Sequence, residues 1–252
     1  MRIVTWNVNS LNVRLPRVLE LLAEHAPDVL CLQETKCDPR TFPTAALEEA
    51  GYVAHHHSAG RWAGVAILAK AEHEITATAS GLPGELVPDE ARWCEATVAG
   101  LRIASAYVTN GRELDSMWFD EKLGFLDAMR ERAPELDVIV GDFNVAPADS
   151  DVYDPAAFAG STHVTADERD RIDAILAAGF VDAYRHLHPD TQQFTWWDYR
   201  QGHFHRGLGM RIDLALLRTP DPASRVAACG IDRAYRKGTK PSDHAPLLVD
   251  LT

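Results

Sequence analysis

Short apolar runs alternate with polar and glycine-containing stretches along the whole chain. Runs rich in Val, Ile and Leu that are bounded by Gly, Pro, Asn or Asp are typical of β-strands. We expect the segments between 52 and 79 to form an antiparallel meander, and the two strands flanking Ala99-Gly100 to form a hairpin. The pattern predicts strands at residues 2–8, 29–32, 52–57, 64–69, 75–79, 92–98, 101–108, 137–140, 191–197, 211–217, 225–231 and 247–251.

Three other segments have apolar residues at every third or fourth position, which predicts helices. These are residues 11–25, 118–132 and 165–178. The third begins with a capping box formed by Thr165 and Glu168, and Gly179 ends it. Residues 145–164 are rich in Asp, Pro, Ala and Ser, which predicts a long loop.

Helices and strands are mixed along the chain, and no Ser- or Gly-rich linker divides it. We therefore expect a single domain spanning residues 1–252, a length that suits one large α/β domain. The halves echo each other faintly, because strands ending near Asn7 and Glu34 correspond to strands beside Asp142 and Asp213. This echo predicts an α/β fold, a four-layer sandwich of two packed, mixed β-sheets flanked by helices.

The composition is that of an ordinary globular protein, with 46% hydrophobic and 25% charged residues. No apolar run is long enough to span a bilayer, and the chain enters a strand pattern at once. We therefore expect no membrane segment and no signal peptide. The four cysteines form no CxxC pair, which favours reduced thiols in a cytoplasmic protein.

The net charge of −12 is unexpected for a protein that binds an anion such as DNA, but the charge is unevenly distributed. Residues 198–241 contain nine Lys or Arg and four Asp, so this span has a local charge of +5. A basic face on an acidic body is compatible with phosphate contacts. On charge alone, an ordinary salt-bridged surface is the better interpretation.

Polar residues follow several predicted strands at the point where each strand ends. Asp142 and Asn144 come after the apolar run 138–140, and their side chains share a face because they are two residues apart. Such a pair can hold an attacking water and stabilise a negatively charged oxygen. Similar polar groups are Trp6-Asn7, Gln33-Glu34-Thr35 and Ser242-Asp243-His244. Each could simply form a turn, but their joint placement favours an active-site rim.

Two of these groups suggest specific chemistry. Glu34 lies at the mouth of a buried strand, where it could cap the next turn or bind a hard cation such as Mg²⁺. His244 is the best candidate for stabilising a transition state, and it needs a carboxylate to fix its tautomer and raise its pKa. Asp213 lies in an apolar strand, where an unpaired charge is costly, so it is the expected partner. For the run His55–His57 we prefer a partly exposed strand to a metal site, because alternation splits the three side chains between two faces.

In sequence and order, these motifs resemble those of the exonuclease III family. These are the apurinic/apyrimidinic (AP) endonucleases of DNA repair, which share the endonuclease/exonuclease/phosphatase fold. Asp-x-Asn and Ser-Asp-His are shared by the wider superfamily, whereas Leu-Gln-Glu-Thr-Lys and Gly-Met-Arg-Ile-Asp-Leu are more specific to the repair branch. The matching segments are Trp6–Asn9, Leu32–Lys36, Tyr107–Asn110, Gly141–Asn144, Gly209–Asp213 and Ser242–Pro246.

The resemblance implies a role for each matching position. Glu34 would be the main Mg²⁺ ligand, and Mn²⁺ could replace Mg²⁺. Asn7 and Asp243 would lie close to the ion, either as further ligands or in contact with the ligands. Asp142 would orient and deprotonate the water. Asn144 would hold that water or a phosphoryl oxygen.

The resemblance also implies how the phosphate is held. His244, paired with Asp213, would contact the scissile phosphate. Tyr107 would bind a phosphate oxygen, and Asn110 would contact the phosphate from the same loop. The cation, the imidazolium and the amide donors would then lie where negative charge grows in the pentavalent transition state.

Further resemblance concerns the DNA itself. Trp196, Met210 and Ile212 match the family's apolar pocket for a base-free sugar, which accepts a flipped ribose and excludes a full nucleotide by size. The segment 199–209 resembles a loop that enters the DNA groove, and we expect Arg200 and Arg206 there to contact DNA.

Two departures from the family pattern affect these expectations. Ser161 replaces an Asn that touches phosphate in some relatives, which puts that contact in doubt. Arg112 follows Asn110-Gly111 in a loop that, in relatives, helps to set the balance between endonuclease and 3′-exonuclease activity.

We therefore expect a monomeric, Mg²⁺-dependent phosphodiesterase that cuts duplex DNA 5′ to abasic sites. It should also remove 3′-blocking groups and have 3′→5′ exonuclease activity. One alternative is a lipid or inositol-phosphate phosphatase of the same fold, which should lack the segment Gly209–Asp213 and Trp196. Another is a non-catalytic DNA-binding protein, which should have lost at least one of Glu34, Asp142, Asp213 or His244.

Overall fold

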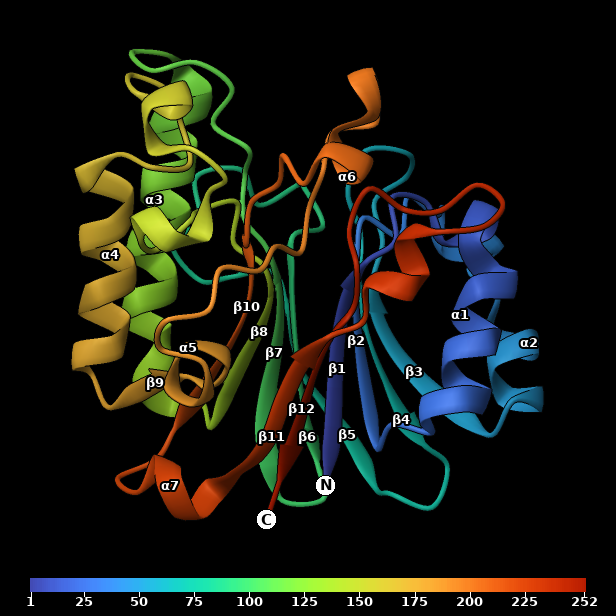
Figure 1. The fold of residues 1–252 in the computed structure, drawn as a ribbon. Coiled ribbons are helices and arrows are strands. Elements are labelled where there is room, and N and C mark those ends of the chain that lie inside the picture. Colours follow the sequence, from blue (N-terminus) through green and yellow to red (C-terminus); the bar gives the residue numbers. More distant parts are fainter.

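Two six-stranded β-sheets lie face to face in the middle of the molecule (Figure 1). The computed structural model describes all of residues 1–252. In the first sheet the strand order is β11 (Val226–Ile231), β12 (Leu247–Leu251), β1 (Arg2–Asn7), β2 (Val29–Gln33), β4 (Val65–Lys70) and β3 (Tyr52–His57). In the second it is β5 (Ile75–Ser80), β6 (Trp93–Val98), β7 (Leu101–Tyr107), β8 (Val138–Asp142), β10 (Asp213–Arg218) and β9 (Phe180–Asp182).

Helices cover the outer face of each sheet, so the predicted four-layer α/β sandwich is confirmed (Figure 1). On the first sheet lie α1 (Leu11–His25) and α2 (Thr44–Glu49), and on the second lie α3 (Met117–Arg132) and α4 (Ala166–Ala177). Three short helices lie in the connections: α5 (Ala183–Leu187), α6 (His203–Arg206) and α7 (Pro222–Arg225). No helix in the structure combines the length and the apolar character needed to cross a membrane.

The alternation of side chains along each strand explains the layering. In β1, Ile3 packs between the sheets, whereas Val4 and Trp6 face the helical layer that contains Leu21 of α1. Because successive strand residues point to opposite faces, a central strand must be apolar on both. The short, continuous apolar runs of the sequence are therefore the strands buried on two sides.

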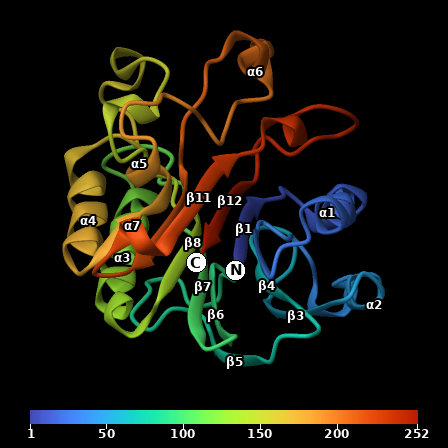
Figure 2. The same ribbon diagram turned by 60° about the horizontal axis from the view of Figure 1, so that its bottom comes forward.

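The chain connectivity brings the strand ends that carry the predicted site residues to one edge of the sandwich. β1 and β2 are parallel and joined by α1, and β7 and β8 are parallel and joined by α3. β10 runs antiparallel to β8, so Asp213 at its start lies opposite Asp142. The predicted echo between the halves is therefore a real topological repeat. The chain termini lie at the other edge, where the Met1 ammonium donates to the Leu251 carbonyl over 2.7 Å (Figure 2).

The structure corrects the prediction of a strand at residues 191–197. This segment forms only single bridges, from Trp196 to Met210 and to His244. The Trp196 and Met210 backbones exchange hydrogen bonds of 2.9 and 3.0 Å, while the Trp197 N–H donates to the Asp243 carbonyl. The alternating apolar and polar residues therefore belong to a segment that is hydrogen-bonded to a loop on each side. It has no neighbouring strand with which to form a continuous ladder.

The predicted meander between 52 and 79 is also wrong in one respect. β3 and β4 pair antiparallel, but β5 crosses to the second sheet and pairs with β6. Local alternation cannot show which sheet an edge strand joins, because both offer an open edge. The hairpin of β6 and β7 is confirmed. The sequence did not reveal β9, the short helices α2, α5, α6 and α7, or the 3₁₀ turns Asp149–Asp151 and Pro155–Phe158 within the long loop.

Candidate active site

The catalytic candidates converge at the edge of the sandwich where β1, β2, β7 and β8 end. Gly141 makes the approach of β8 possible, because its φ is +149° and a Cβ there would lie 2.0 Å from the Ala106 carbonyl oxygen. Only glycine accepts that contact. The next residue, Asp142, is then carried into the centre of the rim, where it is buried.

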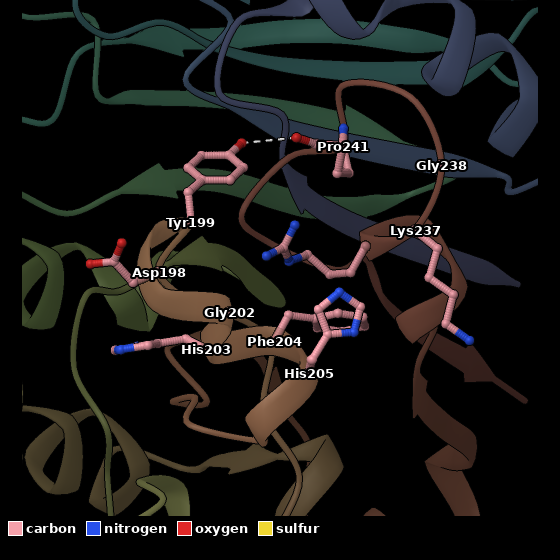
Figure 3. Close-up of a pocket in the computed structure, with 10 residues that line it drawn as sticks. Asp198, Tyr199, Gly202, His203, Phe204, His205, Lys237, Gly238 and Pro241 are labelled. Carbon is pink, nitrogen blue, oxygen red and sulfur yellow. Dashed lines mark hydrogen bonds between the residues drawn. The ribbon is translucent and has the colours of Figure 1, made fainter.

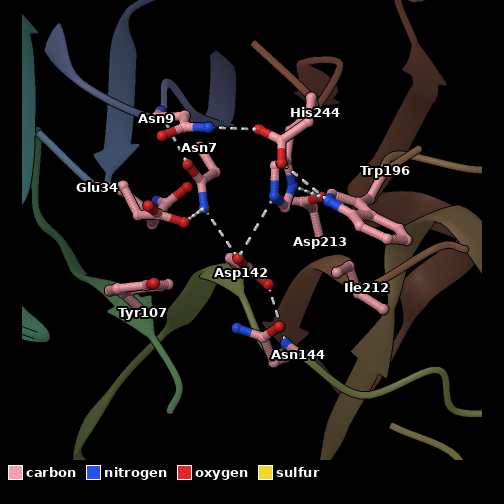
Figure 4. A network of polar contacts seen from close by, with 12 residues as sticks. Asn7, Asn9, Glu34, Tyr107, Asp142, Asn144, Trp196, Ile212, Asp213 and His244 are labelled. Atoms are coloured by element: carbon pink, nitrogen blue, oxygen red, sulfur yellow. Dashed lines mark hydrogen bonds and ion pairs between the residues drawn. The ribbon is translucent and has the colours of Figure 1, made fainter. Parts of the chain in front are cut away.

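Asp142 lies in a network that joins both sheets (Figure 4). The Asn7 amide nitrogen donates to Glu34 Oε1 over 2.8 Å and to Asp142 Oδ2 over 2.9 Å. The other Asp142 oxygen accepts the Asn144 backbone N–H over 2.9 Å. Asn7 thus holds the two carboxylates side by side, with its nitrogen rather than its oxygen turned toward them.

His244 is paired as the sequence predicts. Its Nδ1 lies 2.8 Å from Asp213 Oδ2, and its Nε2 lies 3.7 Å from Asp142 Oδ2. Burial lowers the pKa of His244, but the charges of Asp213 and Asp142 outweigh burial and raise it to about 10. The imidazole is therefore a cation at neutral pH, suited to binding a negatively charged oxygen.

The pKa of Asp142 is raised to about 7. Burial is the largest cause, and the charge of Asp213 adds to it, while the His244 cation opposes both. A carboxylate whose pKa lies near neutrality is well matched to taking a proton from water.

The loop carrying His244 is fixed to β1 by buried hydrogen bonds. Ser242 Oγ donates to the Asn7 carbonyl over 2.7 Å, and the Trp6 indole N–H donates to the His244 carbonyl over 3.0 Å. Asp243 accepts from Asn9 over 3.0 Å and from the Trp196 indole over 3.1 Å. Burial alone would raise the pKa of Asp243, but the His244 charge and these two hydrogen bonds lower it.

The opposite side of the rim is formed by Tyr107, Asn110 and Asn144. The Asn144 side chain donates to the Val108 carbonyl over 2.9 Å and accepts from Asn110 over 3.2 Å. Burial, followed by the Glu34 charge, raises the pKa of Tyr107, so its hydroxyl stays protonated. Glu34 and Asn144 have φ values of +50° and +51°, a strained conformation that concentrates at functional sites.

A pocket of about 180 Å³ opens among these groups. One wall is apolar and consists of Trp196, Met210 and Ile212. Gly209 lets this wall form, because a Cβ there would lie 2.5 Å from the Trp197 indole nitrogen. The lining of the pocket consists of His163 and ten of the predicted residues: Glu34, Tyr107, Asn110, Asp142, Asn144, Trp196, Met210, Ile212, Asp243 and His244.

The donor set fits a hard divalent cation. The charged side chains of the site are four carboxylates and two cations: Glu34, Asp142, Asp213, Asp243, Lys36 and His244. Glu34 and Asp142 bring carboxylate oxygens within 4.8 Å of each other, and the buried Asp213 Oδ1 has no hydrogen-bond partner. As an imidazolium, His244 offers no lone pair, so the available ligands are oxygens, which Mg²⁺ prefers.

Two predicted DNA contacts lie away from this pocket. Arg200 is exposed and its guanidinium engages Asp198, with a shortest distance of 2.6 Å. Arg206 is an exposed residue at the end of α6. Ser161 is also exposed, and the pocket is lined instead by His163.

Sequence reasoning missed a buried cation behind the rim. The Lys122 ammonium of α3 donates to the carbonyls of Asn144 and Asn110 over 2.6 and 3.2 Å and pairs with Glu168 of α4. His163 Nδ1 also contacts the Asn144 carbonyl, and burial lowers the pKa of this imidazole to about 4. The capping box at Thr165 was predicted, but the second partner of Glu168 was not.

A second missed group supports the pocket wall. Arg211 is fully buried and bonds to Asp151 over 2.7 and 3.0 Å and to Asp182 over 2.7 Å. It follows Met210 and precedes Ile212, so its two ion pairs fix the backbone that presents both apolar side chains. An Arg flanked by Met and Ile gives no local sign of such distant partners.

The chain matches the family model described as Endonuclease/Exonuclease/phosphatase family over residues 4–244. DNA repair nuclease APEX1 of Danio rerio is 30% identical, over 100% of this chain and 82% of that protein. Exodeoxyribonuclease III of Haemophilus influenzae is 28% identical over 99% of both. Recombination repair protein 1 of Drosophila melanogaster is 30% identical over 99% of this chain, which spans 37% of that protein's length.

Solved structures agree with these sequence relatives. An AP endonuclease from Archaeoglobus fulgidus has a TM-score of 0.94 and 36% identity, covering 100% of this chain and 99% of that one. The 3′-5′ exonuclease NExo of Neisseria meningitidis, also solved as a 3′ phosphatase bound to a product DNA hairpin, has a TM-score of 0.91, 38% identity and the same coverage. This chain therefore belongs to the endonuclease/exonuclease/phosphatase family, in its exonuclease III branch of DNA repair nucleases.

Proposed function

We propose that the protein is a Mg²⁺-dependent phosphodiesterase that cuts duplex DNA 5′ to abasic sites and also processes blocked 3′ ends, with 3′→5′ exonuclease activity. The observation that carries this proposal is the position of Asp142. It lies between the Asn7 amide and the His244 imidazolium, beside Glu34. The same pocket has the apolar wall of Trp196.

In this mechanism Asp142 accepts a proton from the attacking water, and Asn144 helps to hold that water. The His244 imidazolium, oriented by Asp213, donates to a phosphoryl oxygen and stabilises the charge that develops on it. The Tyr107 hydroxyl and the Asn110 amide would bind the remaining oxygens. Mg²⁺ held by Glu34 would supply Lewis-acid stabilisation of the phosphate. Asn7 would position the two carboxylates.

The proposed substrate class depends on the apolar wall. Trp196, Met210 and Ile212 offer no hydrogen-bond partner for a base edge apart from the Trp196 indole, which already donates to Asp243. A flipped sugar without a base would fit against this wall, and a normal nucleotide would be disfavoured. The name of the Archaeoglobus protein, an AP endonuclease, supports this activity, and that of the Danio relative supports a DNA repair nuclease. The name of the Neisseria enzyme supports action at 3′ ends.

We also propose that the protein acts as a monomer in the cytoplasm. One chain supplies every group of the proposed mechanism. All four cysteines are free and buried, as in proteins that keep reduced thiols.

A substrate panel tests this function. Wild-type protein with Mg²⁺ would be incubated with three substrates in separate reactions. These are a duplex with one tetrahydrofuran site, a duplex of the same sequence with a nick and a 3′-phosphate in place of that site, and an inositol phosphate. We expect cleavage of the first and phosphate release from the second. Phosphate release from the inositol phosphate with both DNAs intact would favour the lipid-phosphatase alternative, and no reaction on any substrate would favour a non-catalytic protein.

A further inference from the structure

A second cavity lies beside the catalytic pocket, between α6 and the loop that follows the 3₁₀ turn Arg233–Arg236 (Figure 3). Its volume is about 310 Å³. We call it the basic groove, defined by six of its lining residues: Tyr199, His203, Phe204, His205, Arg236 and Lys237. Four of them belong to the segment 199–209, which is expected to enter the DNA groove, but none of the six side chains has a role in the mechanism proposed above.

Arg236 is the unusual member of the basic groove. Its side chain is 6% exposed, yet no carboxylate lies within ion-pairing distance of its guanidinium. The guanidinium donates only to the carbonyls of Ser242 and Trp197, and Nε is buried without a partner. By contrast, the buried Arg211 is held by two aspartates. A buried charge without a counter-charge is costly, so the groove is prepared for an anion.

The other groups around Arg236 reinforce this electrostatic character. Lys237 and His205 are exposed at the mouth of the groove, and His203 is half-buried beside them. The one acid in its lining, Asp198, is engaged by Arg200. Burial lowers the pKa of Arg236, while the more distant Asp243 charge opposes this effect.

Aromatic rings fix the Arg236 guanidinium in place. It lies 5.4 Å from the Tyr199 ring centroid and 5.0 Å from that of Phe204. Stacking of this kind orients a guanidinium at a low entropic cost. Arg236 is therefore a fixed positive centre, and Lys237 adds an exposed one.

The basic groove and the catalytic pocket are lined by neighbouring residues of the same two segments. Trp196 lines the pocket and Asp198 lines the groove, two residues further along the same segment. On the facing segment, Asp243 lines the pocket and Pro241 lines the groove. The Tyr199 hydroxyl bridges the segments by donating to the Pro241 carbonyl over 2.8 Å. Since extended chain advances about 3.5 Å per residue, the two cavities are separated by a few nucleotide steps at most.

We propose that the basic groove binds a backbone phosphate of the DNA strand that enters the catalytic pocket, within a few nucleotides of the scissile phosphate. This inference rests on the proposed function. The guanidinium of Arg236 supplies the fixed counter-charge and Lys237 closes over the phosphate. Because the contact is with the backbone, it contributes affinity and register but no sequence preference.

A neutral-phosphate scan tests the proposal. In a duplex with one tetrahydrofuran site, each phosphate of the cut strand is replaced in turn by an uncharged methylphosphonate, and the Kd is measured by fluorescence anisotropy in EDTA. In wild-type protein we expect one position near the lesion to weaken binding about three- to tenfold. In Lys237→Ala protein, which keeps Arg236, the same replacement should weaken binding by a smaller factor than in wild type. If every replacement weakens binding by the same factor in wild type and in Lys237→Ala, the proposal is wrong.

Salt dependence provides an independent readout and a matched control. Loss of one phosphate contact should reduce the slope of log Kd against log salt by about 0.9, which is about a threefold change between 50 and 200 mM. Lys237→Ala should show this reduction, and Lys70→Ala, at the far end of β4, should not. Equal slopes for Lys237→Ala and wild type would contradict the proposal. Absence of cleavage by wild type in Mg²⁺ would instead contradict the proposed function, since the binding assay needs no cleavage.

Discussion

At the scale of single residues, the site depends on two shared interactions. The Asn7 amide nitrogen donates hydrogen bonds to both Glu34 and Asp142. The Asp213 carboxylate, paired with His244, raises the pKa of the imidazole and keeps it positively charged. These residues could be predicted from sequence because each is a polar side chain next to an apolar strand, where burying an unpaired polar group or charge is costly.

Lys122 and His163 could not be predicted in the same way. A lysine in an amphipathic helix normally reaches solvent, and only the tertiary structure buries its ammonium beneath the carbonyls of Asn110 and Asn144. His163 lies in a long loop whose path no periodic pattern describes.

The Asp213→Asn substitution tests the paired imidazolium. An amide cannot supply the charge that raises the pKa of His244, so the cation at the phosphate is weakened. We expect kcat on the abasic duplex to fall by about 10²–10⁴-fold with little change in KM. The matched control is Asp232→Asn, which breaks another Asp–His pair, with His25 at 3.0 Å, away from the pocket. Similar kinetics for Asp213→Asn and wild type would refute this role.

At the scale of elements, the three long helices and the central strands were the most predictable parts. The helix at 11–25 has the predicted bounds, because its apolar residues pack on one face of the first sheet. The strand prediction for residues 191–197 failed because the backbone partners of this segment are the distant residues Met210 and Asp243, which no local pattern reveals. The prediction for β5 failed because tertiary contacts, which local sequence does not show, determine which sheet an edge strand joins.

The buried pair of Lys122 and Glu168 ties α3 to α4. Replacing Lys122 by Met should leave the Glu168 carboxylate buried without its counter-charge. We expect the free energy of unfolding to fall by about 3–5 kcal/mol, measured by urea denaturation. The double variant Lys122→Met/Glu168→Gln should recover part of the loss, because no buried charge is left unpaired. A single variant as stable as wild type would show that the pair is not needed.

The same pair predicts a pH dependence of stability. Burial raises the pKa of Glu168, but the Lys122 charge and several hydrogen bonds outweigh burial and lower it below the ordinary value of 4.5. Its contribution is therefore fully present above pH 4.5 and is lost as the pH falls through the lower, folded pKa. The stability difference between wild type and Glu168→Gln should shrink as urea titrations are moved below about pH 4.5. A constant difference across that range would contradict the assignment.

At the scale of the whole molecule, two sheets meet so that one edge gathers the candidate catalytic groups. The layering could be predicted, since the apolar runs show which strands are buried on both faces. The charge distribution could be only partly predicted. The basic span 198–241 is real, but Arg200 is neutralised by Asp198, and Arg236 is a buried cation without a carboxylate partner.

Binding of Mg²⁺ should stabilise the folded protein as a whole. At 100 times its Kd, a ligand of the native state contributes about 2.7 kcal/mol, which corresponds to a rise in Tm of roughly 5–10 °C. Glu34→Ala removes the principal oxygen donor and should abolish the rise, whereas Glu72→Ala, in a surface cluster, should keep it. An equal rise in the Glu34→Ala variant would place the cation elsewhere.

The most direct test of the central claim is the single-turnover cleavage rate of a duplex with one tetrahydrofuran site, in Mg²⁺, for wild type and Asp142→Asn. The substitution keeps the size of the side chain and removes its ability to take a proton. We predict incision 5′ to the site by wild type, a rate at least about 10³-fold lower for the variant, and a similar Kd for DNA in both. An uncut duplex with wild type, or equal rates for the two proteins, would contradict the account.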